Sequence, residues 1–550
     1  MTVTKLSDDE RVREPWRPYV LLGLALLAVG LAAWRPIPVG VWHDDGVYML
    51  VGKALAEGHG FSYQGVVGAP PAVKFPPVYP LLVAGAWTVF RDIGTVTLVL
   101  TLANLVFLSG AGALLARALR TGAGLPRPIA LLAGGLAIVS ADVLRTSSAV
   151  LSEPLFLFLV ASSLALWPRA LGEAEHDHDG SRGWLLLGAA LLLMVGTRAA
   201  GLPFVAGFAL AAALSVGLRP AVLLAAPAAV GWVAWTGWAA GRAREVPADM
   251  ADLLGPYSGW LREQILNDPA SFVARFPAHA LGVAERILIL LLPRTESPWL
   301  WLAALPLLFL LAAGWSEARR RFPPLAWCTL GYAALLLLWP YLGRRLVVPL
   351  HVLSVGLIVL GGYRYSRRLE PSAASAPSWR RWLGAAAIAW AGFYTVVTTV
   401  RIAQEWPTAG YVIRAQRLAG GVEAMTRTVP GDAVVGAPEF WAGLHLHGGW
   451  TVAPSVLFDP ASTDLEAPSW GSPEAQERLW RSAGIEYLLL EQGGLLHGAT
   501  LDRLEARCPG AIAVLARVPP MMVVRLPWAA REEAASDGAS GACPPPEPAP

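Results

Sequence analysis

Long apolar segments alternate with short polar ones over the first 400 residues of the chain, and this pattern predicts membrane-spanning helices. A helix needs about 20 residues to cross the hydrocarbon core at about 1.5 Å per residue. We place eleven spans near residues 19–39, 96–117, 128–147, 153–169, 184–200, 201–218, 220–240, 298–314, 323–341, 346–363 and 382–400. The remaining 150 residues have ordinary polarity. The fold class that we expect is therefore a polytopic α-helical membrane protein with a small C-terminal α/β domain.

Two apolar stretches are too short to count comfortably as spans. Val78–Phe90 and Leu281–Leu292 are about 13 and 12 residues long, against about 20 for a crossing. Counting either one as a span would move the next arginine cluster to the other side of the membrane. We interpret both as juxtamembrane helices on the outer face, although a pair of extra spans would raise the total from 11 to 13.

Arginine clusters beside the spans predict the orientation of the chain. Arg11, Arg13 and Arg17 precede the first span, which places the N-terminus in the cytoplasm by the positive-inside rule. Eleven spans put the other clusters on the same side: Arg117, Arg120 and Arg127, then Arg219, then Arg319–Arg321, then Arg364, Arg367, Arg368, Arg380 and Arg381. The C-terminal domain is then extracytoplasmic, at the plasma (inner) membrane of a bacterium. We see no cleavable signal peptide.

The polar end of the chain has the pattern of a small α/β domain. We expect helices over Ala409–Arg427 and 473–483, strands over Asp432–Gly436 and Gly484–Glu491, and a hairpin formed by Ala511–Val518 and Met521–Leu526. The predicted organisation is a membrane domain over 1–400 with its first outer loop at 40–95, an extracytoplasmic domain over 401–530, and a disordered tail over 531–550, which is rich in Ala, Ser and Pro.

Composition agrees with a membrane protein and excludes several other classes. The chain is 55% apolar and only 15% charged, with a mean hydropathy of +0.49. These values exclude a cytosolic enzyme and a disordered chain, and a net charge of +3 gives no support for nucleic-acid binding. Only three of the 43 basic residues are lysines, and two of them, Lys53 and Lys74, lie in the first outer loop.

That loop carries the strongest candidates for chemistry. Asp44 and Asp45 lie directly after the first span and begin a segment with apolar residues at helical spacing. A carboxylate at this place is stabilised by the helix dipole, and the simplest alternative is that the pair only caps the helix. Lys74 follows a Pro- and Gly-rich segment, and its ammonium suits a phosphate group. Its alternative role is that of an ordinary interfacial lysine.

The order of short motifs in this sequence resembles the GT-C class of membrane glycosyltransferases. The nearest branch is that of protein O-mannosyltransferases and aminoarabinose transferase-like enzymes, which is similar to glycosyltransferase family 39. The motifs are Asp-Asp-x-x-Tyr at 44–48, Gly-x-Gly-Phe at 58–61, Lys-Phe-Pro-Pro-x-Tyr-Pro-Leu at 74–81, Ser-Glu-Pro-Leu-Phe at 152–156, Gly-Thr-Arg at 196–198 and Gly-Arg-Arg-Leu-Val-Val-Pro at 343–349. The resemblance covers residues 1–400 and the position of the C-terminal domain.

The resemblance implies an inverting glycosyltransferase that takes its sugar from a polyprenyl-phosphate donor in the bilayer. Asp44 corresponds to the acidic residue that acts as general base or orients the acceptor, and Asp45 stands where relatives often carry Glu. Which of the two carboxylates is the base therefore stays open. The implied residues around the lipid phosphate and the sugar are Lys74, Arg198, Arg344, Arg345, Glu153, Tyr48 and His43. Glu153 has a plainer alternative role, which is to orient its loop through an ion pair with Arg145.

Metal ligands and cofactors are not predicted. The His-Asp-His-Asp run at 176–179 reads as a solvated cytoplasmic loop, and His445 and His447 alternate in a strand-like segment with no third ligand evident. The polyprenyl-phosphate sugar is a co-substrate rather than a cofactor, and a metal requirement stays open. Cys508 and Cys543 both fall outside the membrane and could pair, whereas Cys328 lies within a span.

Two other functions compete with a glycosyltransferase. A transporter or flippase for a lipid-linked glycan would carry charges at mid-membrane and broken helices in paired halves. A non-catalytic envelope assembly protein would tolerate substitutions in the first loop but not on its C-terminal domain. The partners expected in each case are the lipid bilayer and no nucleic acid, and the extracytoplasmic acceptor of a transferred sugar cannot be read from the sequence.

Overall fold

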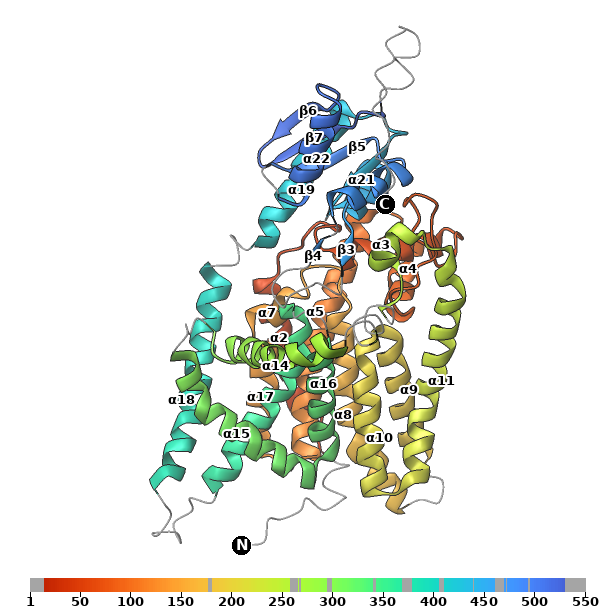
Figure 1. Ribbon diagram of the computed structural model, residues 1–550. Coiled ribbons are helices and arrows are strands. Elements are labelled where there is room, and N and C mark those ends of the chain that lie inside the picture. Colours follow the sequence, from red (N-terminus) through yellow and green to blue (C-terminus); the bar gives the residue numbers. More distant parts are fainter. Residues whose placement is uncertain are drawn as a thin grey trace.

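The computed structural model in Figure 1 has a body of helices with a mixed β-sheet domain at one end. The structure describes residues 14–176, 181–257, 266, 269–293, 299–339, 343–367, 378–404, 410–438, 440–459, 469–470, 472–492 and 495–529. The expected fold class is confirmed, because apolar helices make up the body and a small sheet follows them in the chain.

Each of the eleven predicted spans corresponds to a helix of the body. These helices are α2 (Arg17–Ala33), α5 (Ile93–Thr121), α6 (Arg127–Ile138), α8 (Glu153–His176), α9 (Ser181–Thr197), α10 (Leu202–Ser215), α11 (Leu218–Arg242), α15 (Trp299–Arg321), α16 (Pro323–Leu338), α17 (Arg344–Arg367) and α18 (Ser378–Gln404). Within the described residues, six are long and apolar enough to cross a membrane by length and composition, namely α5, α8, α11, α15, α17 and α18. The chain is a multi-pass membrane protein.

Two of the predicted spans extend well beyond the end of the helix that forms there. α2 ends at Ala33 rather than at residue 39, because Pro36 and Pro38 follow and the residue before a proline disfavours helix. The segment 128–147 is not one helix, since α6 ends at Ile138 and Ser140 is extended before the short α7 (Ala141–Arg145). The break lets α7 carry polar side chains at the end of the apolar body.

The two short apolar stretches form helices in addition to the eleven that correspond to the predicted spans. α4 runs over Val78–Phe90, as expected, whereas α14 (Pro269–Leu291) begins twelve residues before the predicted start at Leu281. Figure 1 shows α14 lying across the other helices, and α4 beside α3 (His43–Ala56) below the sheet domain. Shorter elements are α12 (Ala251–Leu254), η1 (Ala199–Gly201), η2 (Ala243–Glu245) and η3 (Ala248–Met250).

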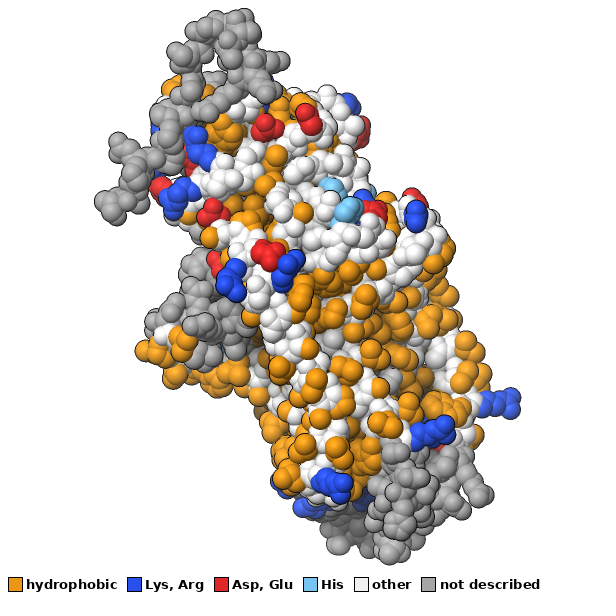
Figure 2. Space-filling view, turned by 90° about the vertical axis from the view of Figure 1, so that its right-hand side faces the viewer, with side chains coloured by type: hydrophobic (Ala, Val, Ile, Leu, Met, Phe, Trp, Pro, Cys, Tyr) orange, Lys and Arg blue, Asp and Glu red, His pale blue; other side chains and the backbone are white. Residues whose placement is uncertain are grey.

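Apolar and charged side chains separate along the molecule. Figure 2 shows apolar side chains over the helical body, basic side chains at its far end, and charges of both signs around the sheet domain. At that far end, the carboxylate of Glu14 accepts hydrogen bonds from Arg120 (3.4 Å) and Arg127 (2.9 Å), while Arg117 donates to the Glu14 main-chain oxygen (2.9 Å). The arginine cluster after α5 therefore lies on the same side as the N-terminal segment, as predicted.

The C-terminal domain contains a five-stranded sheet of order β2-β1-β5-β7-β6. Its strands are β1 (Val434–Ala437), β2 (Thr451–Pro454), β5 (Tyr487–Glu491), β6 (Ala513–Val518) and β7 (Met521–Arg525), and a second pair comprises β3 (Phe458–Asp459) and β4 (Ser469–Trp470). β1 is parallel to β2 and β5, whereas β7 is antiparallel to β5 and β6. The helices are α19 (Gly410–Thr428), α20 (Trp441–Gly448), α21 (Pro473–Ser482) and α22 (Leu495–Arg507).

Most predicted elements of this domain are present, and one prediction is wrong. The predicted helices at Ala409–Arg427 and 473–483 are found as α19 and α21. The predicted strands Asp432–Gly436 and Gly484–Glu491 are found as β1 and β5, and the hairpin as β6–β7. His445 and His447 lie in α20 rather than in a strand, and each ring nitrogen contacts a main-chain oxygen, that of Trp450 or that of Val39 (2.8 Å each). Alternating polarity was misleading here because an eight-residue helix is too short to show its period.

The first outer loop and the C-terminal domain share one hydrophobic core. Val47, Tyr63 and Val66 of the loop are buried in the same cluster as Trp441 and Leu488 of the domain. A parallel β-bridge joins Val66 to Val452, with main-chain hydrogen bonds of 3.0 and 2.8 Å. The C-terminal domain is therefore packed on the segment that carries the candidate chemistry.

Candidate active site

The N-terminal turn of α3 gives different surroundings to the two adjacent carboxylates. Asp45 is fully buried, and its Oδ1 accepts hydrogen bonds from the main-chain N–H groups of Gly40 (3.1 Å), Trp42 (3.0 Å) and Gly46 (2.6 Å). Burial raises the pKa of Asp45 well above its usual range, although these N–H groups act in the opposite direction. Asp45 thus closes the turn that begins α3.

Asp44 faces basic side chains instead of the backbone. Its Oδ2 lies 2.6 Å from Nη2 of Arg345, and the residue is 9% exposed. Burial raises the pKa of Asp44, but the positive charge of Arg345, its hydrogen bond to Asp44 and the charge of Arg198 outweigh burial and bring the pKa down to about 2. Asp44 is consequently a carboxylate at any physiological pH.

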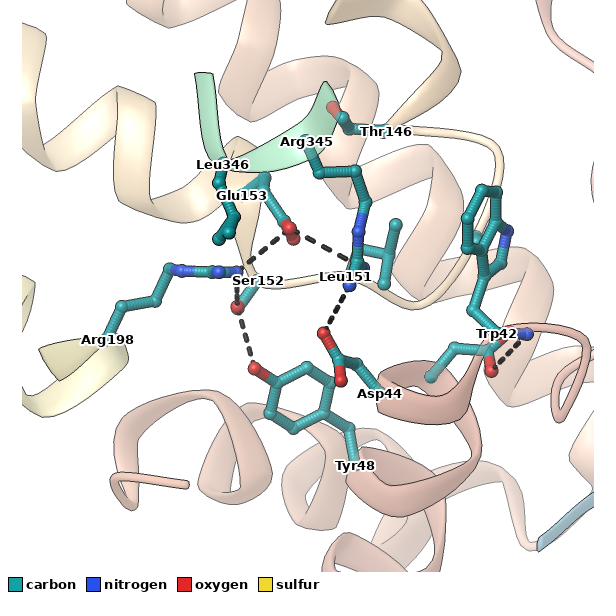
Figure 3. Close-up of polar contacts among 12 residues, drawn as sticks. Trp42, Asp44, Tyr48, Thr146, Leu151, Ser152, Glu153, Arg198, Arg345 and Leu346 are labelled. Atoms are coloured by element: carbon teal, nitrogen blue, oxygen red, sulfur yellow. Dashed lines mark hydrogen bonds and ion pairs between the residues drawn. The ribbon is translucent and has the colours of Figure 1, made fainter. Parts of the chain in front are cut away.

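Glu153 joins two arginines that lie 147 residues apart in the chain. Its Oε1 is 3.0 Å from Nη1 of Arg198 and 3.5 Å from Nη1 of Arg345. Glu153 is the first residue of α8, Arg198 follows α9, and Arg345 lies in the first turn of α17. Figure 3 shows the resulting row of alternating charges, from Arg198 through Glu153 and Arg345 to Asp44.

Glu153 does not form the predicted alternative ion pair with Arg145. Arg145 instead lies 3.5 Å from Asp142, three residues before it in α7, and its guanidinium lies 5.4 Å from the ring of Tyr411. The reason is the break after α6, which places Arg145 and Asp142 on the same short helix. Glu153 is left to the two arginines of the site.

Ser152 and Tyr48 extend the row of contacts to α3. Nη1 of Arg198 donates to the Ser152 hydroxyl (2.9 Å), which lies 2.9 Å from the Tyr48 hydroxyl. The ring of Tyr48 packs on Phe75 (5.0 Å) and Tyr79 (4.8 Å). The aromatic residues of the Lys-Phe-Pro-Pro-x-Tyr motif therefore hold α3 against the loop that carries Glu153.

Lys74 lies in a buried position near Asp44. Its Nζ donates to the main-chain oxygen of Leu253 (2.7 Å) and lies 4.9 Å from the centre of the Tyr257 ring. Burial lowers the pKa of Lys74 to about 8, against the raising effect of the Asp44 and Asp252 charges. The ammonium is therefore still charged at neutral pH but is close to losing its proton.

His43 and Arg344 are the remaining predicted residues. The ring of His43 lies edge-on to Trp441 of the C-terminal domain (5.5 Å), and burial, helped by Lys74, lowers its pKa to about 4. His43 is thus a neutral side chain between Asp44 and the sheet domain. Arg344 is the first residue of α17, but its side chain lies outside the described part of the structure.

Sequence reasoning gave no separate role to two polar residues that support the site. Ser152 was noted only as part of a motif, although it links Arg198 to Tyr48. The buried amide of Asn104 in α5 donates to the main-chain oxygens of Ala149 (3.0 Å) and Leu151 (3.2 Å), which holds the segment before Glu153. An asparagine within a long apolar run was the available signal.

The described residues contain no group of three or more His, Cys, Asp or Glu side chains that could hold a metal ion. Residues 177–179 of the His-Asp-His-Asp run lie outside the described residues, as does Cys543. Cys508 is disulfide-bonded, whereas Cys328 is a buried free thiol.

Two acidic side chains, Asp44 and Glu153, thus form ion pairs with Arg198 and Arg345, and the charge of a third basic residue, Lys74, interacts with that of Asp44. They come from four separate parts of the chain and converge between the helical body and the sheet domain. Guanidinium and ammonium groups in this arrangement can bind a phosphate, and one singly charged phosphodiester would balance the charge of the five groups.

Known structures share the fold of this chain. ArnT from Cupriavidus metallidurans, bound to undecaprenyl phosphate, matches with a TM-score of 0.53 and 13% identity over 92% of this chain and 97% of that chain. The apo oligosaccharyltransferase of Archaeoglobus fulgidus matches with a TM-score of 0.50 and 13% identity over 86% and 69%. Its complex with Zn and sulfate gives a TM-score of 0.52 and 12% identity over 86% and 68%.

The sequence itself matches no protein-family model and no curated protein. At 12–13% identity the structural likeness concerns the fold alone. The chain has the fold of GT-C membrane glycosyltransferases, so the resemblance drawn from the motifs is confirmed at that level.

Proposed function

We propose that this chain is an inverting glycosyltransferase that moves a sugar from a polyprenyl-phosphate donor to an acceptor at the extracytoplasmic membrane face. The observation that carries the proposal is the convergence of Asp44, Glu153, Arg198, Arg345 and Lys74 in one buried cluster. The fold shared with ArnT, whose structure holds undecaprenyl phosphate, supports a lipid-phosphate ligand.

The basic residues of the cluster bind the donor phosphate. Arg198 and Arg345 stand beside each other on Glu153, and Lys74 approaches Asp44 from the first loop. As the bond between the anomeric carbon and the phosphate oxygen breaks, the electron pair stays on that oxygen. The three positive charges stabilise the phosphate that departs with the polyprenyl chain.

Asp44 receives the acceptor. An acceptor hydroxyl or amine attacks the anomeric carbon from the face opposite the phosphate, and its proton passes to the carboxylate. A carboxylate with a pKa of about 2 is a weak base, because Arg345 is its close partner. When the donor phosphate draws Arg345 towards itself, Asp44 loses part of this stabilisation and becomes more basic.

Asp45 supports the site without taking part in the transfer. All three of the hydrogen bonds to its Oδ1 come from the turn that begins α3, so its role is to fix the direction of Asp44. Of the two carboxylates, we therefore propose Asp44 as the general base.

The proposed location is the outer face of a bacterial plasma membrane. The basic cluster around Glu14 lies at the end of the helical body far from the sheet domain, so the positive-inside rule puts the sheet domain outside. The disulfide at Cys508 agrees with an oxidising compartment around that domain.

The proposal is tested by comparing lipids and glycans by mass spectrometry between a deletion strain and its parent. We expect one class of lipid or glycan to lose a sugar in the deletion strain and to regain it with the wild-type gene. The Asp44→Asn variant should fail to restore it at an equal protein level. The matched control is Asp45→Asn, which keeps an acceptor oxygen for the turn and should restore the product.

Unchanged profiles in the deletion strain, or full restoration by Asp44→Asn, would contradict the proposed activity. If the protein were a flippase, its deletion would instead cause the lipid-linked sugar to accumulate on the inner leaflet, and the Asp44→Asn variant would restore the wild-type distribution.

A further inference from the structure

A cavity of about 270 Å³ lies on the far side of Arg345 from Arg198. Its wall includes Trp42, Thr146 and Arg345, and none of Lys74, Arg198 or Glu153 is part of the lining. Figure 3 shows Trp42 and Thr146 on one side of Asp44 and Arg198 on the other. The cavity and the cluster that would hold a phosphate thus lie on opposite sides of the Asp44–Arg345 pair.

This placement matches the geometry of an inverting transfer. In such a reaction the attacking group and the leaving group lie on opposite faces of the sugar ring. If Arg198 marks the side of the leaving phosphate, the acceptor has to approach from the side of Trp42 and Thr146. The inferred direction of acceptor approach rests on the proposed function, whereas the inference that the cavity binds a ligand does not.

The polar groups of the wall favour a ligand with neutral hydroxyls. Asp142 and Arg145 lie 3.5 Å apart, so the wall offers an acceptor and a donor side by side. A hydroxyl can donate to the first and accept from the second. The charged groups of the wall already have partners of opposite charge, since Asp142 lies 3.2 Å from Arg401 and Arg345 lies 2.6 Å from Asp44. A free ion of either sign would have to compete with these pairs, whereas a neutral hydroxyl would not.

The apolar part of the wall and the size of the cavity point to a sugar ring. Trp42 presents an indole, and two aliphatic side chains, Leu151 and Val348, complete the wall. Such surfaces suit the C–H groups of a sugar. A cavity of about 270 Å³ has room for one sugar ring.

The C-terminal domain contacts two residues of the cavity wall without lining the cavity itself. Arg414 of α19 lies 5.9 Å from the ring of Trp42, and the guanidinium of Arg145 lies 5.4 Å from the ring of Tyr411 of α19. The position of α19 therefore helps to fix the side chains of Trp42 and Arg145.

We propose that the cavity bounded by Trp42, Asp142, Arg145, Thr146 and Arg345 is the acceptor subsite and binds the sugar ring of a saccharide or glycolipid headgroup. Gly343 provides the means to test it. A Cβ built on Gly343 meets no atom within 4 Å, so a larger side chain can project into the cavity without a backbone clash. Gly498 in α22 is a matched control, since its Cβ is equally free.

The experiment uses the full-length protein in nanodiscs and saturation-transfer difference NMR with methyl glucoside as the probe. We expect a signal in the wild type and in Gly498→Phe, and a signal at least fivefold weaker in Gly343→Phe. Saturating undecaprenyl phosphate should leave the wild-type signal in place. Binding of undecaprenyl phosphate and the thermal unfolding midpoint show whether each variant is folded.

The proposal is overturned if the wild type gives no signal, if folded Gly343→Phe gives the wild-type signal, or if undecaprenyl phosphate displaces the glucoside. It is also overturned if a threonine-containing pentapeptide, rather than the glucoside, gives the signal that Gly343→Phe removes. Glucosyl diacylglycerol in the nanodisc separates the two sources, because displacement by it supports a lipid headgroup and an undisturbed signal supports a soluble glycan. Failure of undecaprenyl phosphate to bind, with the glucoside signal intact, overturns the proposed donor but supports the saccharide site.

Discussion

Asp44 and Asp45 are neighbours in the sequence, yet one contacts an arginine 301 residues away and the other contacts the backbone of its own turn. Sequence reasoning could find the pair but not divide its roles. The division depends on the course of Gly40–Trp42, which brings two N–H groups back to Asp45 and leaves Asp44 to face Arg345. No local pattern encodes that course.

The same holds for the other residues of the site. Lys74, Glu153, Arg198 and Arg345 were predicted because charged side chains are rare in the apolar part of the chain and recur in an ordered set of motifs. Their pairing was not predictable, since each partner comes from a different helix end. Glu153 was paired with Arg145 in the simplest alternative, and the structure pairs it with two other arginines.

At the scale of single residues, the first prediction concerns Lys74 and pH. Burial, which opposes the effect of nearby carboxylates, lowers its pKa to about 8, so the ammonium is charged below that pH and neutral above it. The phosphate monoester keeps its charge in this range, because its second pKa is about 6. We expect the Kd of undecaprenyl phosphate to rise about tenfold from pH 7 to pH 9.

Lys74→Arg is the control for this pH dependence, because a guanidinium stays charged over the whole range. Its affinity should change little between pH 7 and pH 9, measured by calorimetry in nanodiscs. A flat profile in the wild-type protein would show that Lys74 does not contact the phosphate.

A second prediction separates the stability of an ion pair from its function. Glu153→Gln leaves Arg198 and Arg345 with fewer negative neighbours, and removal of a buried partner costs about 3–5 kcal/mol. Glu14→Gln removes a similarly buried carboxylate that contacts Arg120 and Arg127 at the other end of the body. Both variants should lower the thermal unfolding midpoint.

Only Glu153→Gln should reduce sugar transfer per folded molecule, by at least tenfold, because the two arginines lose the carboxylate that sets their spacing. Equal transfer by the two variants would mean that Glu153 is a stabilising residue alone. The readout is the product regained in the deletion strain, divided by the amount of folded protein.

At the scale of elements, the helices of the body were predictable and their breaks were not. Every predicted span has its helix because apolar length is a strong signal. The break between α6 and α7 was missed although the apolar run ends at Val139 and the polar residues Ser140, Asp142 and Arg145 follow it. In the sheet domain, α20 was mistaken for a strand because an eight-residue helix is too short to show its period in the sequence.

The contact between α3 and α20 gives a prediction at this scale. Gly40 has a φ of +90°, and a Cβ on it would overlap the backbone of Gly443 beside α3. Gly40→Ala should therefore push α20 away from the turn that holds Asp45, displace Asp44, and reduce transfer at least tenfold.

Gly68→Ala is the matched control in the same loop. Gly68 also has a positive φ, +72°, but a Cβ there meets no atom within 4 Å. It carries the backbone strain without the clash, which costs about 1 kcal/mol. Similar loss of transfer in both variants would assign the effect to strain rather than to the contact with α20.

At the scale of the whole molecule, the sequence predicted two domains but not that they share a core. The link between Val66 and Val452 consists of backbone hydrogen bonds, for which no side-chain pattern exists. The orientation of the chain across the membrane could be predicted from its arginine clusters. This prediction can be tested by labelling.

Gly68 and Gly124 are suited to this test because both are exposed turn glycines of positive φ with free space around the Cβ position. We expect Gly68→Cys to react with a membrane-impermeant maleimide in intact cells, and Gly124→Cys to react only after permeabilisation. Cys328 is buried and Cys508 is disulfide-bonded, so the background is low. The reverse pattern would contradict the proposed orientation.

The β-bridge between Val66 and Val452 also affects the order in which the site is completed during synthesis. The ribosome finishes the first outer loop long before it makes β2, and at about 5–20 residues per second the interval is roughly 20 to 80 s. During that interval α3 lacks the partner that covers His43 and fixes the turn at Asp45. A nascent or prematurely terminated chain is thus inserted in the membrane without a finished site, and its loop is the segment that proteases and chaperones meet first.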